Sequence, residues 1–218
     1  MTVTLALTTS AADPEWEEAY EGLAFSAFAL ATQADDPELG KLATEVRGLL
    51  GDWEQVEGDR RRARADAIAA RAHVAVADAA LDLALTRIAE AILAETSGSR
   101  EHGLYRRFFP EPHERVIALG LDAELPIAAA AMAQLDEGEA VPDALKAYVE
   151  TLRRCLAMGN ASLGARAECY ANLGRLESRV EAWLETADAT TRNVHGDLTR
   201  IADERGLPYH WVASFFSR

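Results

Sequence analysis

Apolar residues recur at the spacing of an α-helix over a long central stretch of the chain. From about Asp59 to Thr96 no proline or glycine interrupts the sequence. One row of apolar residues repeats every seven positions at Val74, Leu81 and Ile88, and a second row interleaves with it at Leu85 and Ile92. Such a seam predicts a long helix that packs against others in a bundle. Asp78 is the polar exception in the second row.

A second long stretch with the same spacing lies near the end of the sequence. It runs from about Ala161 to Glu204, and its apolar positions repeat every seven residues at Leu173, Val180, Ala187, Val194 and Ile201. Two long helices joined by shorter ones predict an all-α fold, an antiparallel up-and-down helical bundle. No segment alternates with the period of two that a half-buried β-strand requires.

Shorter helices are predicted around these two. Asp13-Pro14-Glu15 combines an N-cap residue, a proline and an acid, which predicts a helix over about 14–32. A similar signal at 35–38 begins another helix, and the glycines 48, 51 and 58 predict a kink or a break before the long helix. Further helices are expected over 114–121, from Pro126 to Leu135, and from Asp143 to Met158.

The order of these elements indicates how the chain is organised. Residues 1–13 lack periodicity and are predicted to form a flexible N-terminal tail, which leaves 14–218 as the bundle domain. The segments Gly58–Phe109 and Gly159–Phe216 each join a long Ala- and Arg-containing stretch to a glycine, a Leu, a Tyr and a Phe pair. This similarity predicts a duplication with halves 14–109 and 110–218. The alternative is shared composition, because Ala-rich helices resemble one another.

Composition narrows the classes of partner. The chain has 36 acidic and 22 basic residues, a net charge of −14, which argues against a nucleic-acid partner because phosphate binding needs a basic face. No apolar run approaches the about 20 residues of a membrane span, so we expect no membrane partner and a cytoplasmic protein. The dominance of arginine over lysine and the abundance of alanine indicate a bacterial origin.

Catalytic and metal-binding motifs are missing from the sequence. It has no Glu-x-x-His, His-Glu-x-x-His, phosphate-binding loop or Gly-x-Ser-x-Gly. Cys155 and Cys169 lack the spacing of a zinc or redox motif. We therefore predict no catalytic residue, no metal and no cofactor, and a non-enzymatic protein rather than an enzyme.

One pair of carboxylates departs from this picture. Asp78 and Asp82 are one helical turn apart, and such a pair can transfer protons or bind a cation. The alternatives are a partly open end of the bundle and a salt bridge to an arginine of another helix.

The last long helix carries an unusually polar stretch. Its β-branched and polar residues are poorer helix formers than Leu or Ala, and they continue positions that are apolar earlier in the helix. We predict that a ligand pocket is lined by Thr190, Thr191, His195 and Asp197. Frayed packing, a water-filled interior and a partner contact are the alternatives.

Two aromatic clusters follow the long helices. The first contains Tyr105, Phe108 and Phe109, and the second contains Trp211, Phe215 and Phe216. Aromatic side chains of this size are costly to leave in water, so they dock either onto the chain's own bundle or onto a second subunit. We therefore predict a helical interaction or scaffold protein that associates with a protein partner or with itself as a homodimer, with these six residues at the interface. A small-ligand-binding bundle is the alternative.

Overall fold

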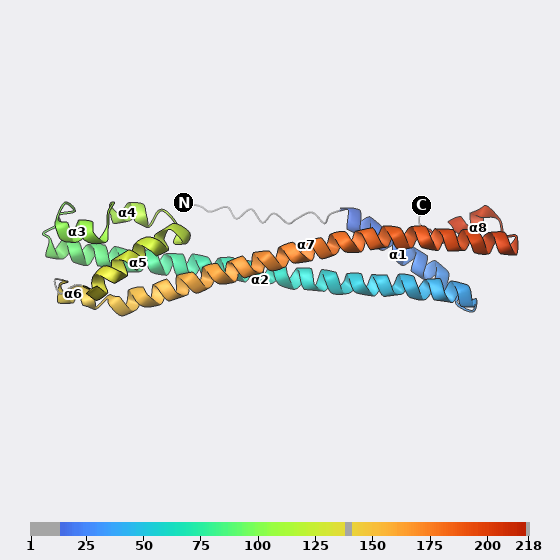
Figure 1. The fold of residues 1–218 in the computed structure, drawn as a ribbon, viewed down its shortest axis with the longest axis horizontal. Coiled ribbons are helices and arrows are strands. Elements are labelled where there is room, and N and C mark those ends of the chain that lie inside the picture. Colours follow the sequence, from blue (N-terminus) through green and yellow to red (C-terminus); the bar gives the residue numbers. More distant parts are fainter. Residues whose placement is uncertain (1–13, 138–140, 217–218) are drawn as a thin grey trace. The chain divides into compact units, whose positions relative to one another are not determined.

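The computed structural model describes residues 14–137 and 141–216, so the tail predicted over 1–13 lies outside the described residues. This part of the chain contains helices and no strand, which confirms the all-α fold (Figure 1). The helices are α1 (Pro14–Ala31), α2 (Pro37–Glu95), α3 (Gly103–Phe108), α4 (His113–Val116), α5 (Leu121–Glu137), α6 (Asp143–Lys146), α7 (Val149–Arg205) and α8 (Tyr209–Ala213). None of these helices is both long enough and apolar enough to cross a membrane.

The chain forms two compact units, and both use parts of the long helices α2 and α7. Unit 1 contains the described residues up to Arg62 together with those from Leu173 onwards, and unit 2 contains Ala63–Asn172. The duplication with halves 14–109 and 110–218 stays a prediction. In Figure 1, α3, α4, α5 and α6 lie beside the segments of α2 and α7 that belong to unit 2.

The two long helices are antiparallel within unit 1. Trp183 of α7 donates from Nε1 to the carbonyl oxygen of Leu49 on α2 at 3.0 Å. Further along α2, Asp59 pairs with Arg179, which precedes Trp183 on α7. The rings of Trp53 and Trp183 lie 4.5 Å apart, and Trp16 of α1 packs against Trp53 at 5.0 Å. These three tryptophans join α1, α2 and α7 in one core.

The core of unit 2 is built on the apolar seam predicted from the sequence. Leu81, Leu85, Ile88 and Ile92 are fully buried, each at 0 % exposure. They pack in one cluster with residues of α3 to α7. Burial of such a side chain contributes about 1.5–3 kcal/mol, so this row accounts for a large part of the stability of the unit.

A kink or a break was predicted in α2, and the break is wrong, because the helix runs through Gly48, Gly51 and Gly58. Each glycine costs about 1 kcal/mol relative to alanine in a helix interior. Leu49 and Trp53 lie between these glycines and are 8 % and 1 % exposed. Because each buried side chain contributes about 1.5–3 kcal/mol, tertiary packing outweighs the local preference.

Other predicted boundaries also shift. α7 is continuous through Gly159, where two separate helices were expected. The helix predicted over 114–121 is only the short helix α4, and α5 begins at Leu121 and contains Pro126. Gly120 has a φ of 83°, a left-handed conformation that only glycine adopts easily, and it turns the chain into α5.

Candidate functional site

Three carboxyl groups meet inside unit 2. Asp78 and Asp82 project from successive turns of α2, because residues four apart share a helix face. Glu124 approaches them from the first turns of α5. One oxygen atom of each residue lies within 4.8 Å of the oxygens of the other two. We call Asp78, Asp82 and Glu124 the carboxylate cluster.

Local structure fixes the position of Glu124. The turn at Gly120 starts α5, and the backbone N–H of Gly120 donates to Glu124 Oε1 at 3.2 Å. Leu121 and Leu125, on either side of Glu124, are buried in the core of unit 2. The side chain is therefore held on the face of α5 that packs inward.

The carboxylate cluster is short of hydrogen-bond donors. Glu124 has 0 % exposure, and Asp78 and Asp82 are half-buried. Glu124 Oε2, Asp78 Oδ1 and Asp82 Oδ1 are buried, and no hydrogen-bond partner in the chain reaches them. A buried polar atom without a partner costs about 1–3 kcal/mol, and more when it is charged. This arrangement favours the uptake of either a proton or a cation.

The electrostatics of the cluster point the same way. Burial, followed by the adjoining carboxyl of Asp82 and the charge of Asp78, raises the pKa of Glu124 to about 7. Burial also raises the pKa of Asp82, a hydrogen bond with Glu124 lowers it in part, and the charge of Asp78 raises it further. No basic side chain is among the groups that shift either pKa.

The sequence pointed to two of the three members of this cluster. Asp78 and Asp82 were recognised as a pair that could bind a cation, and Glu124 was missed. In the sequence Glu124 is one of two acids near a helix start, beside Asp122, and acids are common there in any protein. Only the packing of α5 against α2 distinguishes Glu124 from its neighbour.

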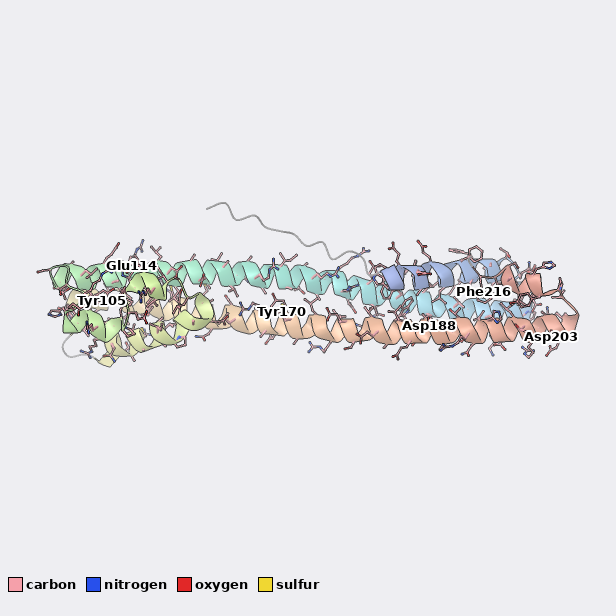
Figure 2. The ribbon with its side chains drawn as sticks, turned by 90° about the horizontal axis from the view of Figure 1, so that it is seen from above. Tyr105, Glu114, Tyr170, Asp188, Asp203 and Phe216 are labelled. Atoms are coloured by element: carbon pink, nitrogen blue, oxygen red, sulfur yellow. The ribbon has the colours of Figure 1, made fainter. Side chains whose placement is uncertain are left out.

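Two of the four residues predicted to line a ligand pocket, Thr191 and Asp197, line different depressions of unit 1, and a pocket shared by all four stays a prediction. Thr191 lines a depression of about 440 Å³ in unit 1 together with Asp188 and Phe216. Asp188 and Phe216 are labelled in Figure 2. Asp197 lines a different depression of about 290 Å³. Thr190 is buried, and His195 packs against the ring of Phe216 at 5.5 Å.

The first predicted aromatic cluster packs inside the core of unit 2. Tyr105, Phe108 and Phe109 are 1–2 % exposed. The hydroxyl of Tyr105, labelled in Figure 2, accepts a hydrogen bond from the backbone N–H of His113 at 3.1 Å. These residues dock onto the chain's own helices, and their contact with a second copy stays a prediction.

The second aromatic cluster packs in unit 1. Phe215 is buried, whereas Trp211 and Phe216 are half-buried. The rings of Trp211 and Phe215 meet edge-to-face at 4.9 Å. They anchor the segment around α8 on the core of the unit.

An uncovered apolar face lies elsewhere, on α2 within unit 2. Six apolar residues at helical spacing are all exposed: Ile68, Ala72, Ala75, Val76, Ala79 and Leu83. We call them the α2 stripe. A cavity of about 400 Å³ adjoins it, lined by His73, Val76, Met158, Ala161, Ser162 and Ala165. The stripe continues through this cavity onto apolar residues of α7.

Comparison with known proteins adds no relative, since no family model, no curated protein and no solved structure matches this chain.

Proposed function

We propose that this chain is a non-enzymatic helical interaction protein that self-associates as a homodimer through the α2 stripe. The observation that carries the proposal is the row of exposed apolar side chains along one face of α2. Ile68, Val76 and Leu83 are 57 %, 63 % and 51 % exposed. Single exposed apolar residues are normal on a protein surface, but a contiguous apolar patch marks an interaction site.

The spacing of the α2 stripe supports a single binding face. Its members follow one another at intervals of one, three or four residues, so they occupy a band about 100° wide around the helix. This is the width of the face that a helix normally buries against a neighbour. In the part of unit 2 that the structure describes, this band stays exposed to solvent.

The stripe is also complementary to itself. Ile68 and Leu83 lie equally far from the midpoint between Ala75 and Val76, and so do Ala72 and Ala79. A twofold axis through that midpoint would place Ile68 against Leu83 of a second, antiparallel copy. Isologous dimers require such a self-matching patch. The alanines near the centre allow the two helices to approach to about 8–10 Å.

Self-association can be tested by the mass in solution. We expect the chain, of 23.6 kDa, to sediment as a dimer at micromolar concentration and pH 7.5. Ile68→Glu or Leu83→Glu should convert it to a monomer, because each dimer would bury two new charges without partners. Ala133→Glu is the matched control, since Ala133 is an exposed apolar residue on α5, away from the stripe. A wild-type monomer, or variants that all stay dimeric, would refute the proposed interface.

The antiparallel arrangement has its own test. In a chain carrying Cys169→Ser, Ala75→Cys would lie near the twofold axis and should form a disulfide-linked dimer on mild oxidation. Ile68→Cys in the same background lies far from the axis and should cross-link poorly. Efficient cross-linking at position 68 instead of 75 would indicate a parallel dimer or a different register.

Small-ligand binding is the second candidate, favoured by the depression of about 440 Å³ beside α1 and α7. Glu18, Asp188 and Thr191 supply polar groups there, and Leu23 and Phe216 supply apolar surface. Such a mixture suits a small cationic ligand with an apolar part. A thermal-shift screen of aromatic amines would test this, with Asp188→Asn as the variant expected to lose any response.

A further inference from the structure

We propose that Asp78, Asp82 and Glu124 bind one hard divalent cation, of the class of Ca²⁺, Mn²⁺ and Mg²⁺, inside unit 2. The site shares no residue with the α2 stripe, although Asp78 and Asp82 border it on α2, each three positions after one of its alanines. The proposed cation site and the proposed dimer can therefore be tested separately.

The geometry of the carboxylate cluster fits a single ion. Two oxygen ligands of one Ca²⁺ ion are separated by at most about 5 Å, since each lies about 2.3–2.6 Å from the metal. One oxygen from each of the three residues falls within 4.8 Å of the others. Asp78 and Asp82 supply two ligands from α2, and Glu124 supplies a third from α5. A small inward movement of the side chains would bring all three onto one ion.

Burial distinguishes this cluster from acidic groups on a surface. Glu124 is 0 % exposed, and its Oε2 has no hydrogen-bond partner in the chain. Asp78 Oδ1 and Asp82 Oδ1 are buried and unpartnered in the same way. A buried carboxylate needs a compensating charge or donor, and a bound cation would satisfy all three oxygens at once.

The basic side chain in the ion pair near Glu124 does not compensate the charge of the carboxylate cluster. Asp122, near Glu124 on α5, pairs with Arg166 of α7 at 2.8 Å, so that arginine is already engaged. The groups that shift the pKa of Glu124 are two carboxyls, burial and one backbone N–H. The local charge is therefore negative, which attracts a cation.

The ligand atoms determine the class of metal. All three residues supply carboxylate oxygen, and the cluster includes no histidine or cysteine. Oxygen-only sites prefer Ca²⁺, Mg²⁺ and Mn²⁺, whereas Zn²⁺ sites usually include nitrogen or sulfur ligands. Three side chains are too few for the 6–8 ligands of Ca²⁺, so water molecules would complete the shell.

Cation binding would join two elements of unit 2. Asp78 and Asp82 belong to α2, and Glu124 belongs to α5, so the ion would cross-link these helices. Metal that binds only the folded state stabilises it, and it competes with protons for the same oxygens. Binding should therefore weaken as the pH falls below the range in which Glu124 loses its proton.

The experiment measures Mn²⁺ and Ca²⁺ binding to the full chain. After treatment with a chelator and dialysis at pH 7.5, Mn²⁺ is titrated and its free fraction is followed by electron paramagnetic resonance, with calorimetry for Ca²⁺. We expect one ion per chain and an increase in melting temperature with either metal. Glu124→Gln and Asp82→Asn should each weaken binding at least tenfold.

The control variants distinguish binding at the carboxylate cluster from weak cation binding to the many exposed acidic residues. Glu90→Gln removes an exposed carboxylate from the same helix and should leave binding unchanged. Gln at position 124 has the shape of protonated Glu, so this variant should fold, and Asp82→Asn provides a second route if it does not. Absence of binding at millimolar Mn²⁺ and Ca²⁺, or equal binding by wild type and Glu124→Gln, would overturn the proposal. If neither metal binds, the carboxylate cluster holds only a proton.

Discussion

At the scale of single residues, Glu124 is the most unusual group in the described chain. It is an acid with no exposed surface, placed beside two other acids. Some acids that pair with basic side chains behave in the opposite way. The hydrogen bond from Arg205 lowers the pKa of Asp36, and that from Arg179 lowers the pKa of Asp59. Acids with a raised pKa and acids with a lowered pKa therefore change the stability of the fold in opposite directions as the pH rises.

The direction in which Glu124 makes stability depend on pH follows from its pKa, which burial raises from 4.5 to about 7. Between these values the folded state binds more protons than the unfolded state, so this group's contribution to stability falls as the pH rises. Without divalent cations, we expect Glu124→Gln to be more stable than wild type at pH 7.5, and this difference to shrink at pH 5. Urea unfolding at both pH values measures it. A difference that stays constant with pH would contradict the raised pKa.

At the scale of elements, glycines in the long helices serve different purposes. Gly159 of α7 is buried, and a Cβ there would lie 2.8 Å from Cδ2 of Leu125 on α5. Gly164, on the same helix, has no atom within 4 Å of the position that a Cβ would occupy. The absence of a side chain therefore matters for packing at the first position and not at the second.

These two glycines provide a matched pair of substitutions. Gly164→Ala should stabilise the chain by about 0.5–1 kcal/mol, because alanine loses less backbone entropy in a helix. Gly159→Ala gains the same preference but must displace the buried Leu125, so we expect no gain or a net loss. Chemical denaturation of both variants gives the comparison. Equal stabilisation at both positions would show that α5 yields easily at this contact.

The same scale explains how far the sequence could predict the structure. The seam of Leu81 and Ile88 identified the long helix and its buried face, because seven-residue spacing reflects the helix itself. The expected break near Gly51 was wrong because burial of Trp53 by α1 and α7 is not visible in local sequence. Glu124 was missed for the same reason. Its role depends on which helix α5 packs against.

At the scale of the whole molecule, charge opposes association. The chain carries a net charge of −14 at neutral pH and has a pI near 4.8. Two copies therefore repel each other, and the proposed contact through the α2 stripe would have to overcome this repulsion. Salt screens such repulsion over a distance of about 8–10 Å at 0.1–0.15 M.

Acid should strengthen self-association before it unfolds the chain. Lowering the pH toward 4.8 removes net charge. At a protein concentration low enough for monomer and dimer to coexist at pH 7.5, we therefore expect the mean mass from light scattering to rise between pH 7.5 and 5. Added salt at pH 7.5 should raise the mean mass by a smaller amount, because salt screens the same repulsion. Scattering that stays flat down to pH 4.8 would argue against association limited by charge.

The composition of the two units has a consequence for the order in which the chain is made. Unit 2 is one continuous stretch, Ala63–Asn172, whereas unit 1 combines residues from both sides of it. During synthesis, all of unit 2 therefore leaves the ribosome before the tryptophan of α7 that completes the core of unit 1. The part of unit 1 that precedes unit 2 therefore lacks its contacts with α7 while the whole sequence of unit 2 is already available for folding. Closure of unit 1 therefore has to follow the synthesis of unit 2, and a folded unit 2 would reduce the entropic cost of that closure by shortening the loop that must close.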